Sequence, residues 1–151
     1  MGTESIESLL SRYGPSYRWV VTITGMMGAM VMILSSTMIN VAVPSIMGTY
    51  GVGQSDAQWM ATAFLAAMTA SQLLGAWVIS VFGPRVGYIL SILIFTAGSL
   101  LGAYAPNIDI LIFARVIQGF GAGVVQPLAM VTIFKVFPVE QRGLALSVYG
   151  G

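Results

Sequence analysis

Cysteine and histidine are both absent from this sequence, and charged side chains are scarce. Without cysteine or histidine, the chain has no disulfide, no thiol nucleophile and none of the usual zinc ligand sets. Asp, Glu, Lys and Arg make up 7% of the 151 residues, whereas soluble domains contain about 25%. This shortage excludes an ordinary water-soluble globule. A net charge of +1 also offers no basic surface for nucleic acid.

Apolar residues are in excess, since hydrophobic types make up 57% of the chain. Four long runs carry no formal charge or a single one: residues 19–55, 57–84, 86–108 and 110–134. About 20 apolar residues in a helix cross a hydrocarbon core of roughly 30 Å, and the runs lack the alternation typical of strands. The sequence therefore predicts an all-α fold, a polytopic bundle of membrane helices in contact with lipid.

Four transmembrane helices fit these runs, at about 19–43, 57–81, 87–105 and 110–134. We expect the first to end at Pro44, followed by a glycine-containing loop at 48–53. A fifth apolar run at 143–151 is shorter than half a crossing and predicts the start of a fifth helix. Residues 1–18 form an N-terminal tail, for which a short interfacial helix and a disordered segment are both compatible interpretations.

Lys and Arg are distributed unevenly around the predicted helices. They occur in the tail, between the second and third helices and after the fourth, at Arg12, Arg18, Arg85, Lys135 and Arg142. The other two connections hold Asp56 and Asp109 and contain no basic residue. Because Lys and Arg resist translocation, we expect a multi-pass protein of the cell membrane, in bacteria the inner membrane, with a cytoplasmic N-terminus.

The sequence shows no arrangement typical of an enzyme. It has no paired carboxylates and no nucleophile beside a base. The glycine-rich segment at 119–123 lies inside a predicted membrane helix rather than after a strand, so it does not indicate a nucleotide site. We expect no catalytic residue, no cofactor and no metal site.

Glycines recur at four-residue spacing in the predicted third and fourth helices. Gly119 and Gly123 share one face of the fourth helix, and Gly98 shares a face of the third with Gly102. Small residues at this spacing allow neighbouring helices to approach closely. These faces are either tight packing surfaces or surfaces that slide during a conformational change.

Arg115 is the one ionisable residue that we place within a membrane helix. Burying it costs about 2.5–3.5 kcal/mol on insertion scales. Its position near the predicted outer end of the fourth helix is compatible with a side chain that reaches the membrane interface. Gln118 and Gly119 lie on the same helical face, however, which favours a side chain that points into the bundle and has a functional or gating role.

Several uncharged polar residues are also predicted within the membrane, and three are candidates for lining a cavity: Asn40, Gln72 and Gln126. Asn40 and Gln126 either line a water-filled path or bond to neighbouring helices. Pro127 follows Gln126, removes one helical hydrogen bond and predicts a kink in the fourth helix.

Two segments resemble the major facilitator superfamily. The run 111–123 is similar to its motif B, an R-x-x-Q-G-x-G-A pattern, at Arg115, Gln118, Gly119, Gly121 and Ala122. The run 36–44, STMINVAVP, resembles the signature D-x-T-I-V-N-V-A-L-P of the fourteen-helix drug:proton antiporter branch. The resemblance covers about residues 22–151, which correspond to the first four helices and the start of the fifth.

The sequence departs from the family pattern at two places. Ser35 occupies the position of the membrane carboxylate in the branch signature. In the connection after the second helix, the pattern G-x-L-A-D-R-x-G-R-K is reduced to matches at Gly83 and Arg85, with Ser80 in place of the acid and Val81 in place of the first arginine. The acid that ties this loop to neighbouring helices in the family is therefore missing.

The resemblance implies an N-terminal fragment of a secondary active transporter that exports drugs or metabolites. In such a carrier the helices present here would pack against the remaining helices, around a path for a small lipophilic substrate and protons. Arg115 would take the motif B role, but arginine stays protonated, so it cannot be the group that exchanges protons. Two alternatives remain, a carrier of a small polar metabolite and a truncated membrane interaction module without transport activity.

Overall fold

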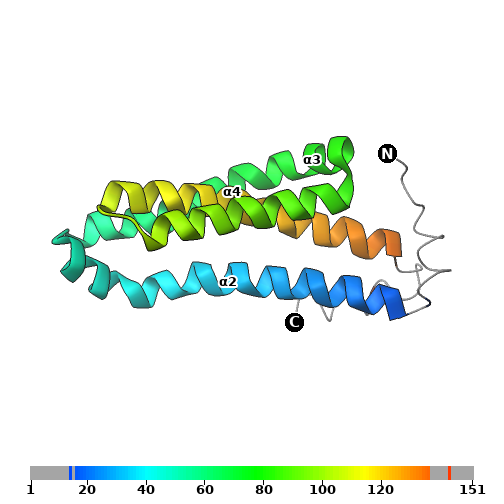
Figure 1. The fold of residues 1–151 in the computed structure, drawn as a ribbon, viewed down its shortest axis with the longest axis horizontal. Helices are drawn as coiled ribbons and strands as arrows, with labels where there is room; N and C mark the ends of the chain where they lie inside the picture. The colour runs from blue at the N-terminus through cyan, green and yellow to red at the C-terminus, as the bar shows by residue number, and fades with distance from the viewer. Residues whose placement is uncertain (1–13, 15, 137–142, 144–151) are drawn as a thin grey trace.

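The structure, a computed structural model, describes residues 14, 16–136 and 143. Within this part of the chain it is built from helices, with no strand: α2 (Ser16–Tyr50), α3 (Gln54–Ala103) and α4 (Ile108–Val136) (Figure 1). All three helices are long and apolar enough to cross a membrane. The all-α membrane helix bundle expected from the sequence is confirmed.

α3 consists of two helices joined at Gly83. A straight helix of 50 residues would measure about 75 Å, more than twice the roughly 30 Å of a hydrocarbon core. Gly83 has φ 78° and ψ 163°, a backbone region essentially restricted to glycine, and Pro84 follows at a first-turn position where its missing N–H is not needed. The chain reverses here (Figure 1), so residues 54–82 and 84–103, the first and second arms of α3, run side by side.

The observed helix ends correct some of the sequence-based boundaries. α2 does not stop at residue 43 but continues through Pro44 to Tyr50, so the loop expected at 48–53 is shortened to residues 51–53. Pro44 removes a single backbone donor, the one that would bond the Asn40 carbonyl, and continuing the helix satisfies the other backbone groups. The helix ends where Gly51 adopts a φ of 63°.

Both chain ends lie largely outside the described residues. Of the predicted tail, Gly14 is described and residues 16–18 belong to the first turn of α2. Of the predicted fifth helix, Gly143 alone is described, and it is helical. At the other boundaries, α3 ends at Ala103 rather than 105, and α4 begins at Ile108, where the Asn107 side chain accepts a hydrogen bond from the backbone N–H of Ile110 (2.9 Å).

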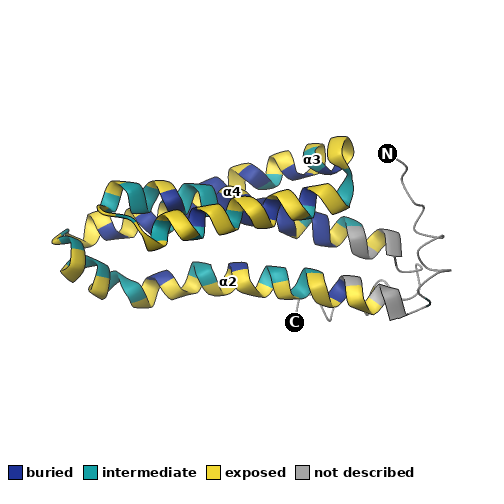
Figure 2. Cartoon of the chain, in the orientation of Figure 1, coloured by how far each residue is buried: buried dark blue, intermediate teal, exposed yellow. Residues whose placement is uncertain are grey.

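α4 is the most buried helix, and it packs against both arms of α3. In its most apolar window 44% of the residues are buried, compared with 11% in α2. Glycines permit this packing: a Cβ on Gly121 would lie 2.7 Å from the carbonyl oxygen of Ser91 in the second arm, and one on Gly119 would lie 2.8 Å from Ala67 in the first. Figure 2 shows buried residues concentrated along α3 and α4, whereas α2 is mostly exposed or partly exposed.

Two tyrosines connect α2 to the rest of the bundle near its ends. The Tyr88 hydroxyl donates to the Thr24 carbonyl (2.8 Å), and the Tyr50 hydroxyl donates to the Ala105 carbonyl (2.9 Å). These bonds place the start of α2 beside the start of the second arm, and its end beside the end of that arm. The four helical segments therefore alternate in direction, as expected for consecutive membrane crossings.

Large apolar side chains cover the outside of the bundle. Val41 in α2 is 84% exposed and Leu73 in α3 is 82% exposed. Contiguous apolar surfaces of this kind are rare on soluble monomers. In a bilayer they contact lipid or other helices.

Candidate functional site

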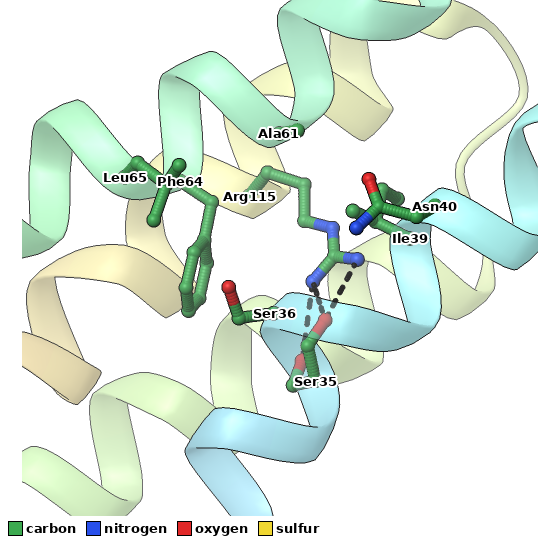
Figure 3. Close-up of a pocket in the computed structure, with 8 residues that line it drawn as sticks. All are labelled: Ser35, Ser36, Ile39, Asn40, Ala61, Phe64, Leu65 and Arg115. Atoms are coloured by element: carbon green, nitrogen blue, oxygen red, sulfur yellow. Dashed lines mark hydrogen bonds between the residues drawn. The ribbon is translucent and has the colours of Figure 1, made fainter.

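The Arg115 side chain extends from α4 across the bundle to α2. Its Nη1 donates to the hydroxyl of Ser35 (3.1 Å) and to the Ser35 carbonyl (3.3 Å), and Nη2 also donates to that carbonyl (3.3 Å). The guanidinium is partly buried, and it points toward α2 rather than along α4 (Figure 3). The geometry agrees with the interpretation in which Arg115 points into the bundle.

The hydrogen bonds continue from Arg115 into the second arm of α3. Nη1 also donates to Oε1 of Gln118 (3.0 Å), and Nε2 of Gln118 donates to the Ser99 hydroxyl (2.7 Å). Ser99 in turn donates to the Phe95 carbonyl of its own helix (2.9 Å). The motif residues Arg115 and Gln118 thus connect α2, α4 and the second arm in one chain of hydrogen bonds.

The first arm of α3 contributes an aromatic ring to the same site. The guanidinium carbon of Arg115 lies 5.6 Å from the centre of the Phe64 ring, within the range of a cation–π interaction. Phe64 is 2% exposed, so its position is fixed by packing. Arg115 therefore contacts α2 and the first arm directly and reaches the second arm through Gln118.

A cavity of roughly 90 Å³ lies beside the guanidinium. Its lining comes from α2, the first arm of α3 and α4: Ser35, Ser36, Ile39, Asn40, Ala61, Phe64, Leu65 and Arg115 (Figure 3). Ser36 and Asn40 are polar, and in the described part of the chain neither side chain has a hydrogen-bond partner. Asn40 thus lies at a cavity, in agreement with the interpretation in which it lines a water-filled path.

The positive charge of Arg115 has no carboxylate partner among the described residues. The acids in this part of the chain are Asp56 and Asp109, each in the first turn of its helix and each exposed. Ser35 supplies a neutral hydroxyl and a carbonyl where the family signature has an acid. The site therefore carries a net positive charge.

Gly119 and Gly123 lie at the contact between α4 and the first arm rather than at the cavity. A Cβ on Gly123 would overlap the Met68 carbonyl and lie 2.8 Å from Cβ of Ser71. Gly98 plays a similar part in the second arm, where a Cβ would lie 2.8 Å from Cγ of Gln118. These contacts agree with the packing interpretation of the glycine faces.

Gln72 and Gln126 form a second polar contact, separate from Arg115. Nε2 of Gln72 in the first arm donates to Oε1 of Gln126 in α4 (3.1 Å). Neither residue lines the cavity with Asn40. The geometry supports the interpretation in which Gln126 bonds to a neighbouring helix. Of the three candidate cavity residues, Asn40 lies at the cavity, whereas Gln72 and Gln126 bond to each other elsewhere.

The loop remnant, Gly83 and Arg85, lies at the break in α3. Arg85 is exposed, and the Ser80 hydroxyl donates to the Trp77 carbonyl of its own helix (2.8 Å). Ser80 therefore does not tie this turn to another helix through that bond. Gly83 provides the backbone conformation that the turn requires.

Sequence reasoning missed Ser99 and Phe64 as partners of the arginine network. Ser99 directly follows Gly98, and the close approach of Gly98 to α4 brings the Ser99 hydroxyl within reach of Gln118. The neighbouring glycine is therefore the sequence signal that could have identified Ser99. Phe64 has no distinguishing sequence signal, because it lies in an apolar run with many similar residues. Tyr50 and Tyr88 stand near helix ends, where tyrosine is common in membrane helices.

Comparisons with known proteins agree with this architecture. The family model of the Major Facilitator Superfamily matches residues 9–151. The chain is 38% identical over 136 residues to the uncharacterised MFS-type transporter YcnB of Bacillus subtilis, covering 90% of this chain and 29% of that protein.

Two further relatives have names that state a function. The puromycin resistance protein pur8 of Streptomyces alboniger is 33% identical, over 96% of this chain and 29% of its own length. The probable multidrug resistance protein EmrY of Escherichia coli is 32% identical, over 87% of this chain and 26% of its own length. The chain thus spans less than a third of the relatives that it matches. It belongs to the major facilitator superfamily.

Proposed function

We propose that these residues are the first four helices of a secondary active transporter that exports lipophilic small molecules in exchange for protons. The observation that carries the proposal is the partly buried Arg115, which lies beside a cavity, contacts α2 and the first arm directly, and is linked to the second arm through Gln118. A charged residue inside a membrane bundle is costly and is a candidate functional residue, for example in a substrate or ion pathway. The printed names of pur8 and EmrY, which refer to drug resistance, support an export function.

Proton exchange needs a group that titrates, and Arg115 is not such a group because arginine stays protonated. In the described part of the chain no acid lies within a membrane-spanning segment away from the first helical turn. The titrating carboxylate is therefore assigned to the later helices of the complete carrier. Proton-coupled export by a complete carrier whose later helices contain no membrane acid would contradict this assignment.

The orientation proposed is a cytoplasmic N-terminus. The start of α2, the break at Gly83 and the end of α4 lie at the same end of the bundle (Figure 1). Arg85 lies at this end, whereas Asp56 and Asp109 lie at the other. Reporter enzymes fused after Arg85 and after Asp109 test the assignment, since the first should report a cytoplasmic location and the second an external one.

Transport itself is tested with the complete carrier in everted membrane vesicles. Three fluorescent dyes, one cationic, one neutral and one anionic, are offered while a pH gradient is imposed. Gradient-dependent movement of at least one dye is expected, and Arg115→Ala should abolish it while the amount of inserted protein stays the same. Movement of no dye by the wild type, or unchanged transport by Arg115→Ala, would contradict the proposal.

A carrier of a small polar metabolite is the second candidate function. Ser35 and Ser80 favour it, because Ser35 replaces the acid of the drug:proton antiporter signature and Ser80 replaces the acid of the family's loop pattern. Uptake of polar metabolites in the same vesicles, without movement of any dye, would select this function. A non-transporting interaction module would move neither class of compound.

A further inference from the structure

The guanidinium of Arg115 has an edge that the bundle leaves unused. Nη1 and one N–H of Nη2 are directed at Ser35 and Gln118. A guanidinium has five N–H donors. Among the described residues, no partner accepts a hydrogen bond from Nε or from the second N–H of Nη2. These two donors form one side of the planar fork, the geometry that binds both oxygens of a carboxylate.

The unused edge borders the cavity, and Asn40 lies next to it. In Figure 3 the Asn40 amide extends from α2 toward the guanidinium, and both residues line the same cavity. The Ser36 hydroxyl borders this space too. Amide and hydroxyl groups supply further N–H and O–H donors for an anion.

Charge balance favours an anion at this place. An unneutralised arginine in a membrane helix is costly, and within the described residues no ion pair offsets that cost. Ser35 engages the adjacent Nη1–Nη2 edge of the guanidinium with neutral oxygens. The site thus fixes the orientation of the guanidinium and leaves its positive charge available to pair with an anion.

The size and walls of the cavity specify what kind of anion fits. A volume of roughly 90 Å³ is well below the roughly 300–1,000 Å³ of sites that enclose a drug-sized ligand, so the cavity accommodates a carboxylate group but not a whole molecule of that size. The other walls are apolar, with Ile39, Phe64 and Leu65 beside the guanidinium. A ligand would place its carboxylate against Arg115 and the adjoining part of its apolar body against these side chains.

We infer that Arg115 and Asn40 bind the carboxylate of a transported substrate, so that the carrier selects amphipathic organic acids. The inference rests on the proposed transport function and adds the substrate class to it. Arg115 donates two parallel hydrogen bonds from Nε and Nη2, and the Asn40 amide donates a third. Ser35 and Gln118 hold the guanidinium in the orientation that presents this edge.

Equilibrium dialysis of the complete carrier in detergent tests the inference with two matched probes. 4-Phenylbutyrate and 4-phenylbutanamide have the same shape, and they differ in that the first is a carboxylate anion at pH 7.5. We expect the carboxylate to bind at least tenfold more tightly to the wild type, after correction for uptake by empty micelles. Arg115→Gln should reduce this preference to less than twofold, and Asn40→Ala should weaken carboxylate binding several-fold.

Two further variants keep the test informative if Arg115→Gln does not fold. Arg115→Lys retains the charge but not the fork, so an intermediate preference is expected. Ser35→Asp places an internal carboxylate against the guanidinium and should remove the preference. Thr62→Val is the matched control, because the Thr62 hydroxyl donates to the Gln58 carbonyl of its own helix on an exposed face, and its probe affinities should equal those of the wild type.

Equal binding of the two probes by the wild type would overturn the inference, including the case in which an acid from a later helix already occupies the guanidinium. A preference that survives Arg115→Gln would overturn it too. Dialysis requires no transport, so dye export without carboxylate preference overturns this inference alone. Carboxylate preference without any gradient-driven movement overturns the transport proposal instead.

Discussion

Replacing Ser35 by aspartate puts a carboxylate where Arg115 now meets a hydroxyl, and the effect on stability can be worked out from the geometry. Nη1 lies 3.1 Å from the Ser35 hydroxyl, so an aspartate there reaches the guanidinium directly. Two unit charges about 4 Å apart attract by about 4 kcal/mol at an effective dielectric constant of 20. Removing the new carboxylate from water costs several kcal/mol, so Ser35→Asp alone should change the free energy of unfolding by less than about 2 kcal/mol.

The pair becomes visible in a double-mutant cycle. In an Arg115→Gln background the new carboxylate keeps its desolvation cost and loses its partner, so Ser35→Asp should be strongly destabilising there. We expect a coupling energy of about 3 kcal/mol between positions 35 and 115. Ser35→Asn, which has nearly the same shape as the aspartate but no charge, should show coupling below about 1 kcal/mol.

The measurement is reversible unfolding of the complete protein in mixed micelles titrated with sodium dodecyl sulfate, followed by tryptophan fluorescence. The wild type, both single variants and the double variant are compared at neutral pH. A coupling energy below about 0.5 kcal/mol, the usual limit for independent sites, would show that Ser35 and Arg115 do not meet in the folded protein. The network described here would then be incorrect.

Three further substitutions test the packing and the connections of the helices. Gly123→Val should destabilise the bundle by more than about 2 kcal/mol, because the new side chain overpacks against Met68 and Ser71. The control Gly48→Ala, with no atom near the new Cβ, should be neutral or slightly stabilising. Similar unfolding midpoints for the two variants would contradict the close approach of α4. Gly83→Ala should lower the free energy of unfolding by about 1–3 kcal/mol, because alanine is strained at a positive φ. Packing adds nothing to this cost, since the new Cβ contacts no atom. An unchanged unfolding midpoint would rule out the positive φ. Tyr88→Phe removes the hydrogen bond to the Thr24 carbonyl and should lower the free energy of unfolding by about 1 kcal/mol. Hydrogen exchange should rise at the start of α2. Unaltered exchange would mean that this bond does not hold the helix in place.

Much of the fold follows from where charges and helix-breaking residues stand in the sequence. The runs without charge predict the helical segments, and the Gly83-Pro84 pair marks the reversal inside α3. The same reasoning failed at Pro44, because proline is read as a helix end in water, whereas α2 continues past it. A bilayer penalises exposed backbone groups so strongly that one missing donor does not end a helix.

The candidate site was predictable in part, along one helix but not between helices. The i, i+3 spacing of Arg115 and Gln118 predicts that they share a face, and they form a hydrogen bond. The contact with Ser35 depends on how far α2 slides relative to α4, and single-sequence patterns do not specify that register. The same holds for Gln72 and Gln126, which are 54 residues apart and still bond directly.

The reversal at Gly83 has a consequence for how the protein is made. A single residue separates the two arms of α3, so there is no slack for a hydrophilic connection to wait outside the bilayer between two insertion events. We expect the two arms to enter the bilayer together as a helical hairpin. An insertion of flexible residues at this turn should therefore uncouple the entry of the two arms, and fewer chains should insert both of them.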